Sequence, residues 1–93
     1  MKNEIRYLIY SMKNKWNGKI FVHYSYKDLS YGITKLYKER GKSLSEELSM
    51  ILNIYPCSNF EWTELEKNVP KHKLQKTLNY WIERLNSREN GYN

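Results

Sequence analysis

Residues 69–85, VPKHKLQKTLNYWIERL, form the most regular pattern in the sequence. Apolar residues recur three or four positions apart in this stretch: Leu74, Leu78, Trp81, Ile82 and Leu85. This is the spacing of one face of an α-helix. Pro70 suits the first helical position, because its missing N–H would have no intrahelical partner there. The pattern predicts an amphipathic helix from residue 70 to about residue 87, entered through a tight turn at 68–69.

Two more helices are expected before this one. The first covers about residues 44–54 and aligns Leu44, Leu48, Ile51, Leu52 and Tyr55 on one face. The second is short and covers about residues 58–67, where Ser58 and Thr63 are each followed three positions later by Glu, as in a capping box. The sequence therefore predicts a medium, a short and a long helix in that order.

That order, with a tight turn before the last helix, resembles the helix-turn-helix or winged-helix DNA-binding superfamily. The resemblance covers residues 44–87 and is carried by Trp62, Thr63, Glu64, Leu65, Val69, Leu74, Leu78, Trp81, Ile82 and Leu85. It departs from the family pattern in the short spacing between Leu65 and Val69 and in the lack of chain for a C-terminal wing. The resemblance implies that the third helix reads the major groove and that the protein is a DNA-binding transcriptional regulator.

The polar side of the long helix supplies the candidate nucleic-acid contacts. They are Lys71, His72, Lys73, Gln75, Lys76, Asn79 and Tyr80. Lys reaches guanine edges or phosphates, and Gln and Asn suit adenine. The alternative, that these are ordinary solvent-facing residues, stays open. Glu64 counts against a DNA contact here, because a carboxylate near phosphate is repelled.

The first half of the chain is expected to contain a helix, a short strand and a second helix. Ile5, Leu8, Ile9, Met12 and Trp16 follow helical spacing and predict a helix over residues 3–16. Asn17-Gly18 signals a turn. The β-branched and aromatic residues of 19–25, KIFVHYS, predict a strand with Phe21 and His23 on one side. A helix is expected over about 26–40.

Positive charge is concentrated in this first half. Residues 1–42 hold ten Lys or Arg and three Asp or Glu, whereas residues 43–93 hold six and seven. Four lysines, Lys13, Lys15, Lys19 and Lys27, alternate with four aromatics, Trp16, Phe21, Tyr24 and Tyr26. Cations beside stacking aromatics are typical of sites that hold single strands. The alternative is that half of these aromatics belong to the core.

Together these patterns predict a mainly α fold in a small single domain. It would contain N-terminal helices, one or two short β-strands and a C-terminal tri-helical unit of the helix-turn-helix type. Residues 1–42 form the basic N-terminal half, residues 43–88 the helix-turn-helix-like unit, and residues 89–93 a polar tail that is expected to fray. The net charge of +6 favours a polyanionic partner, with duplex DNA the first candidate.

Several function classes lack their sequence signatures. His23 and His72 are the two histidines, Cys57 is the single cysteine, and the four glycines form no phosphate-binding loop. We therefore expect no enzyme, no metal and no cofactor. No apolar run is long enough to span a bilayer and the N-terminus is too charged for a signal peptide, so a cytoplasmic protein without membrane contact is expected.

The composition and size of the chain leave two functions open. Lys, Asn and Ile are frequent, which indicates an AT-rich phage or viral genome. If the protein binds DNA, a homodimer is expected, because one short helix gives little sequence specificity. Residues 19–25 or the N-terminal helix would form the dimer contact. The alternative is a phage-encoded, anti-CRISPR-like inhibitor that binds a host protein, since Tyr and Trp are frequent interface anchors.

Overall fold

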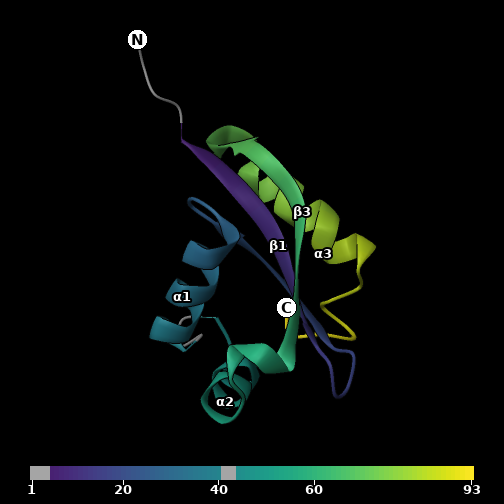
Figure 1. Cartoon of the computed structure of the whole chain (residues 1–93). Helices are drawn as coiled ribbons and strands as arrows, with labels where there is room; N and C mark the ends of the chain where they lie inside the picture. Colours follow the sequence, from purple (N-terminus) through teal and green to yellow (C-terminus); the bar gives the residue numbers. More distant parts are fainter. Residues whose placement is uncertain (1–4, 41–43) are drawn as a thin grey trace.

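A three-stranded antiparallel sheet lies at the centre of the molecule. A computed structural model describes residues 5–40 and 44–93, and all statements on structure concern these residues. The elements are β1 (Arg6–Asn14), β2 (Ile20–Ser25), α1 (Leu29–Glu39), α2 (Glu46–Ile54), β3 (Phe60–Pro70) and α3 (Leu74–Arg84), with short 3-10 turns at Cys57–Asn59 and Lys71–Lys73. The strand order is β2-β1-β3. Helices α1 and α2 lie on one side of the sheet and α3 on the other (Figure 1).

The prediction of a mainly α fold is wrong, and the first error concerns residues 3–16. This segment contains β1, the central strand, which pairs with both β2 and β3. A central strand is buried on both faces, so its apolar residues form a nearly continuous run that periodicity cannot distinguish from a buried helix. Residues 8–12 are all buried. Trp16, which helical spacing placed in the core, is 80% exposed at the β1–β2 turn.

The second error concerns residues 58–67, which form most of β3 rather than a short helix. Their glutamates favour a helix by propensity, but Phe60 and Trp62 alternate with polar residues as in a half-buried strand. Pairing with β1 overrides the weak local preference. Asn68 has a φ of 58° beside a register shift in this pairing, so the expected tight turn is an irregularity within the strand. No helix-turn-helix unit is present in residues 44–93.

The remaining elements agree with the sequence. The strand predicted at 19–25 is β2, and it pairs with β1 of the same chain. The helices expected near 26–40 and 44–54 are α1 and α2. The helix expected from residue 70 is α3, but it begins only at Leu74, because Pro70 ends β3 and Lys71–Lys73 form a 3-10 turn. Asn17 and Gly18 form the β1–β2 turn, in which Gly18 has a φ of 76° that favours glycine.

The predicted boundary at residues 42 and 43 lies outside the described residues, so its position stays a prediction. No helix in the described part of the chain has the length and apolar character needed to cross a membrane.

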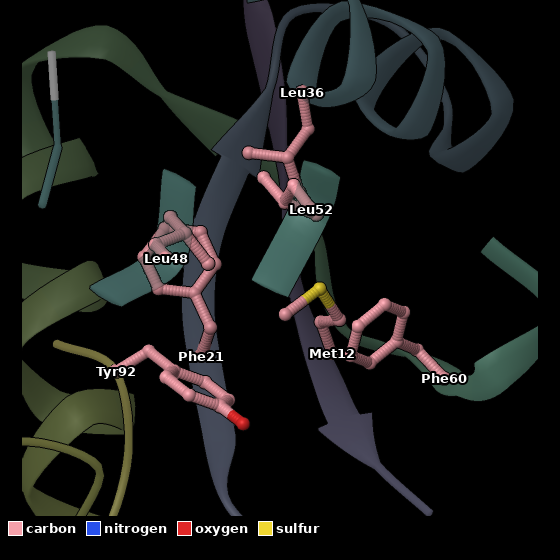
Figure 2. Packing of buried hydrophobic residues seen from close by; sticks show 7 residues of the cluster. All are labelled: Met12, Phe21, Leu36, Leu48, Leu52, Phe60 and Tyr92. Carbon is pink, nitrogen blue, oxygen red and sulfur yellow. The ribbon is translucent and has the colours of Figure 1, made fainter. Parts of the chain in front are cut away.

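The core on the α1 and α2 side joins residues from both sheet and helices. Its buried members are Met12, Phe21, Leu36, Leu48, Leu52, Phe60 and Tyr92. Figure 2 shows these side chains converging between β1, β2 and the two helices. Leu48 and Leu52 are one helical turn apart, so α2 buries one stripe and leaves Met50 and Ile54 exposed.

A second core fills the space between the sheet and α3. Its buried members are Ile9, Val22, Val69, Leu78 and Ile82. Ile9 and Val22 point to this side because side chains alternate along a strand, which places Tyr10 and Phe21 on the opposite side. The amphipathic pattern of residues 74–85 therefore packs α3 against a sheet.

The C-terminal residues are held along the edge of β2, so the prediction of a fraying tail is wrong. The backbone N–H of Tyr92 donates to the Ile20 carbonyl at 2.9 Å. The Asn93 side chain bonds both backbone groups of Val22, at 2.7 and 2.9 Å. A Cβ at Gly91 would collide with the Ile20 carbonyl oxygen, so this close approach requires glycine.

Candidate functional site

A pocket of about 270 Å³ opens between β2 and α1, on the side of the sheet that carries α1 and α2. Its polar and charged lining includes Tyr10, His23, Ser25, Tyr31, Lys35 and Glu39. These residues come from the central strand, the edge strand and the first helix, so the pocket exists only when the sheet and α1 have docked.

The local structure explains why these side chains meet. Tyr10 and His23 are directly opposite each other in the β1–β2 register, and their ring centroids lie 6.4 Å apart. Cross-strand partners point to the same face of a sheet. Lys35 and Glu39 are four residues apart on α1, which places them on one side of the helix.

Gly32 allows α1 to approach the sheet closely. A Cβ at this position would lie 2.8 Å from Ser25 Cβ and 3.1 Å from an edge carbon of Tyr10. The helix runs through Gly32 without interruption. Its glycine, which weakens a helix by about 1 kcal/mol relative to alanine, is explained by this packing.

The pocket holds His23 in its neutral form. Burial, and secondarily the nearby Lys35 cation, lower the pKa of His23 to about 4 from its usual 6.5. Burial also raises the pKa of Tyr10 well above its usual value, so its hydroxyl stays protonated. At neutral pH the pocket therefore combines a neutral imidazole, a protonated phenol, an ammonium and the Glu39 carboxylate. These groups can accept a hydrogen bond, donate one and balance a negative charge.

The contacts predicted on the last helix lie on the opposite side of the sheet. Lys71, His72, Lys73, Gln75, Lys76 and Tyr80 are exposed, and Asn79 is half-buried. Gln75 donates a hydrogen bond to Asn79 at 3.1 Å. The described residues of the N-terminal half, 5–40, leave most of these side chains exposed. Its contact with nucleic acid stays a prediction, although the neighbouring element is β3 and not the second helix of a helix-turn-helix.

The four lysines predicted in the basic half do not form one site. Lys13, Lys15 and Lys19 lie at or near the β1–β2 turn, whereas Lys27 follows the far end of β2. Lys15 donates to the Ser58 carbonyl at 3.2 Å, and Lys19 forms an ion pair with Glu47 at 2.8 Å. Among their aromatic neighbours, Phe21 is buried in the core, while Trp16, Tyr24 and Tyr26 are exposed.

Sequence reasoning missed the pocket residues Tyr10, His23, Lys35 and Glu39. Tyr10 lay in a segment predicted to be helical, and His23 stood in no recognisable motif. The usable signals were the placement of Phe21 and His23 on one side of a strand and the four-residue spacing of Lys35 and Glu39. In the described residues, no three His, Cys, Asp or Glu side chains gather as a group that could bind a metal ion.

Comparison with known proteins identifies similar chains. No protein-family model matches the sequence. Intron-associated endonuclease 1 of Enterobacteria phage T4 is 31% identical over 91 residues, which are 91% of this chain and 35% of that relative. The chain thus spans about a third of the relative's length.

Two solved structures match over nearly the whole chain. A mutant of the catalytic domain of intron endonuclease I-TevI is 32% identical, with a TM-score of 0.78, and the match covers 96% of this chain and 93% of that domain. A second structure of the same catalytic domain is 33% identical, with a TM-score of 0.74, and the match covers 91% and 94%.

These matches correct two further predictions. The resemblance to the helix-turn-helix superfamily is replaced by similarity to an endonuclease domain with a different fold. The expectation that the chain is not an enzyme is overturned, because the matched solved structures are of a catalytic domain. The matches also give no support to a transcriptional regulator. By sequence identity and by coverage of the whole domain, this chain belongs to the family of the I-TevI catalytic domain.

Proposed function

We propose that this chain is a phage-type DNA endonuclease domain that hydrolyses phosphodiester bonds in the pocket between β2 and α1. The observation that carries the proposal is the 32% identity with the I-TevI catalytic domain across 93% of that domain. The basic character of the chain supports a DNA substrate, since cations attract the phosphate backbone and raise affinity at low salt.

The pocket chemistry suits attack by water on a phosphodiester. The neutral imidazole of His23 takes a proton from water as the water oxygen bonds to phosphorus. The bond from phosphorus to the leaving sugar oxygen breaks, and solvent in the open pocket supplies the proton that this oxygen requires. The Lys35 ammonium offsets the negative charge that develops on the phosphate oxygens.

Tyr10 and Glu39 complete the arrangement. The Tyr10 hydroxyl remains a hydrogen-bond donor at neutral pH because burial raises its pKa. It can therefore hold a phosphate oxygen from the floor of the pocket. Glu39 lies one turn beyond Lys35 and supplies a carboxylate that can orient the attacking water.

Cleavage of supercoiled plasmid and of end-labelled duplex DNA tests the proposal, with and without Mg²⁺. We expect nicking by the wild type and a loss of about 100-fold or more in the rate at saturating protein for His23→Ala and Lys35→Ala. Lys38→Ala is the matched control, because Lys38 is an exposed lysine of α1 and does not line this pocket.

Thermal melting of each variant shows whether the substitution affects only the pocket. A wild-type chain that binds DNA but leaves it intact in every buffer contradicts the cleavage step and leaves a DNA-binding domain. Equal losses for Lys35→Ala and Lys38→Ala would instead locate the reaction outside this pocket.

A further inference from the structure

Three exposed tyrosines stand together at the mouth of the pocket. Tyr24 is near the end of β2, Tyr26 follows that strand, and Tyr31 is in the first turns of α1. They are 37%, 43% and 39% exposed, and all three line the pocket that contains His23 and Lys35. Single exposed aromatic side chains are common on protein surfaces, whereas a cluster of them at a pocket indicates a binding surface.

Ring contacts hold this cluster in one arrangement. Tyr7 meets Tyr24 edge to face, with centroids 5.5 Å apart, and meets Tyr26 at 6.3 Å. Tyr26 in turn meets Tyr31 at 6.1 Å with an interplanar angle of 60°. These contacts fix the rings relative to one another, while each of the three tyrosines keeps more than a third of its surface exposed.

The backbone beneath the tyrosines is also held. Asp28 caps α1 by accepting a hydrogen bond from the Tyr31 N–H at 2.8 Å. The Ser25 hydroxyl donates to the Asp28 carbonyl at 2.7 Å. The segment between β2 and α1 is therefore fixed at both ends, so binding a ligand on Tyr26 and Tyr31 requires little further ordering.

Several cations lie near the cluster. The Lys27 ammonium lies 5.6 Å from the Tyr31 ring centroid. Arg6 and Lys67 line a second hollow together with Tyr7 and Lys27, and Lys35 lines the pocket itself. Asp28 in this hollow serves as the helix cap, and Glu64 is paired with Lys67 at 3.2 Å. These two negative charges of the hollow are therefore engaged in capping and pairing, while Glu39 lines the adjoining pocket together with Lys35.

We infer that Tyr24, Tyr26 and Tyr31 form a stacking surface for unpaired DNA bases whose backbone enters the His23 and Lys35 pocket. The inference rests on the proposed function and specifies its substrate as DNA with a locally unpaired strand. Bases inside a duplex are stacked on one another and present no free face, whereas an unpaired base has a face that can cover tyrosine. The surrounding cations match the phosphates on either side of such a base.

Equilibrium binding in EDTA tests the stacking surface without cleavage. Fluorescence anisotropy would compare one labelled oligonucleotide as a single strand, as a full duplex and as a duplex with a four-nucleotide gap. We expect Tyr26→Ala and Tyr31→Ala to weaken binding to the single strand and the gapped duplex by about 5- to 150-fold, the range that corresponds to losing one stacked base. Binding to the full duplex should change less than twofold.

Two variants control the experiment. Tyr26→Phe keeps the ring and should bind like the wild type. Met50→Ala removes a large side chain that is 63% exposed on α2, outside the pocket, and should leave the preference for unpaired DNA unchanged. Equal losses on paired and unpaired DNA, or an effect of Met50→Ala as large as that of Tyr26→Ala, would overturn the inference.

The outcomes also separate this inference from the proposed cleavage. If the tyrosine variants lose affinity for unpaired DNA while the wild type cleaves nothing, the stacking surface stands and the endonuclease proposal fails. If the wild type cleaves fully paired DNA and Tyr26→Ala cleaves and binds equally well, the endonuclease proposal stands and the stacking surface fails.

Discussion

The two sides of the sheet are built for different purposes. On the α3 side, Ile9, Val22 and Val69 are covered by Leu78 and Ile82, and the Trp81 indole closes the edge by donating to Glu66 at 2.9 Å. On the α1 side the covering is incomplete, and Tyr10 and His23 face an open pocket beside Lys35. The same two strands thus supply a filled core on the α3 side, and on the other side a second core beside a polar pocket under α1. Alternation along a strand lets one segment serve both purposes.

The largest expected effect is on the filled side. Ile82→Ala removes a buried side chain from the core beneath α3. We expect a loss of about 2–5 kcal/mol in the free energy of unfolding, because truncation leaves a cavity as well as losing burial. Chemical denaturation measures this loss. Ile54→Ala, which removes an isoleucine that is 65% exposed on α2, is the control and should change stability by less than about 0.5 kcal/mol. Similar losses for both would contradict the contrast between buried and exposed positions.

Acid should affect the open side through His23. Its pKa is about 4 in the folded protein and 6.5 when free, so between these values the unfolded chain binds more protons. Stability is therefore full above pH 6.5 and is lost as the pH falls toward 4. Allowing for partial exposure, the loss should be about 2 kcal/mol. His23→Gln should remove this part of the pH dependence between pH 7 and pH 4. If the free energy of unfolding varies with pH in the same way for wild type and variant, the pKa of His23 is not lowered in the folded protein.

A smaller effect is expected where α1 meets the sheet. Gly32→Ala introduces a methyl group 2.8 Å from Ser25 Cβ, which cannot move without its strand. Crowding costs about 1–3 kcal/mol and the gain in helix propensity is about 1 kcal/mol, so a net loss of about 1 kcal/mol is expected. The same change should lower cleavage by displacing Lys35. A stabilised variant with unchanged cleavage would show that the packing of Gly32 against Ser25 is loose enough to accept a methyl group.

The smallest effect concerns the exposed cations on the α3 side. Replacing Lys71, Lys73 and Lys76 together by Ala should leave the folded state unchanged and weaken paired and unpaired DNA equally. The slope of binding against salt should fall by about one for each lysine that contacts phosphate. An unchanged slope would show that DNA binds the α1 side alone and would remove these residues from the interface.

The errors in predicting the fold share one cause. Helical spacing is informative for α3, where one stripe is buried, but not for β1, which is buried on both sides. The prediction at β3 was wrong because the glutamates at 61, 64 and 66 favour a helix by local propensity. In the folded protein the same residues occupy a strand. The candidate pocket depends on the β1–β2 register, which places Tyr10 opposite His23. No pattern within either strand specifies that pairing.

The sequence alone determined the turn at Asn17-Gly18, the edge strand that follows it, the three helices and the concentration of positive charge in the first half. Each of these depends on residues close together in the chain, through backbone preference or one-sided burial. Tertiary structure decided that residues 6–14 and 60–70 are strands and that Tyr10, His23 and Lys35 share one pocket. It also decided that Gly91 and Tyr92 lock onto β2. The physical reason is that contacts between distant residues outweigh local propensities of less than about 1 kcal/mol per residue.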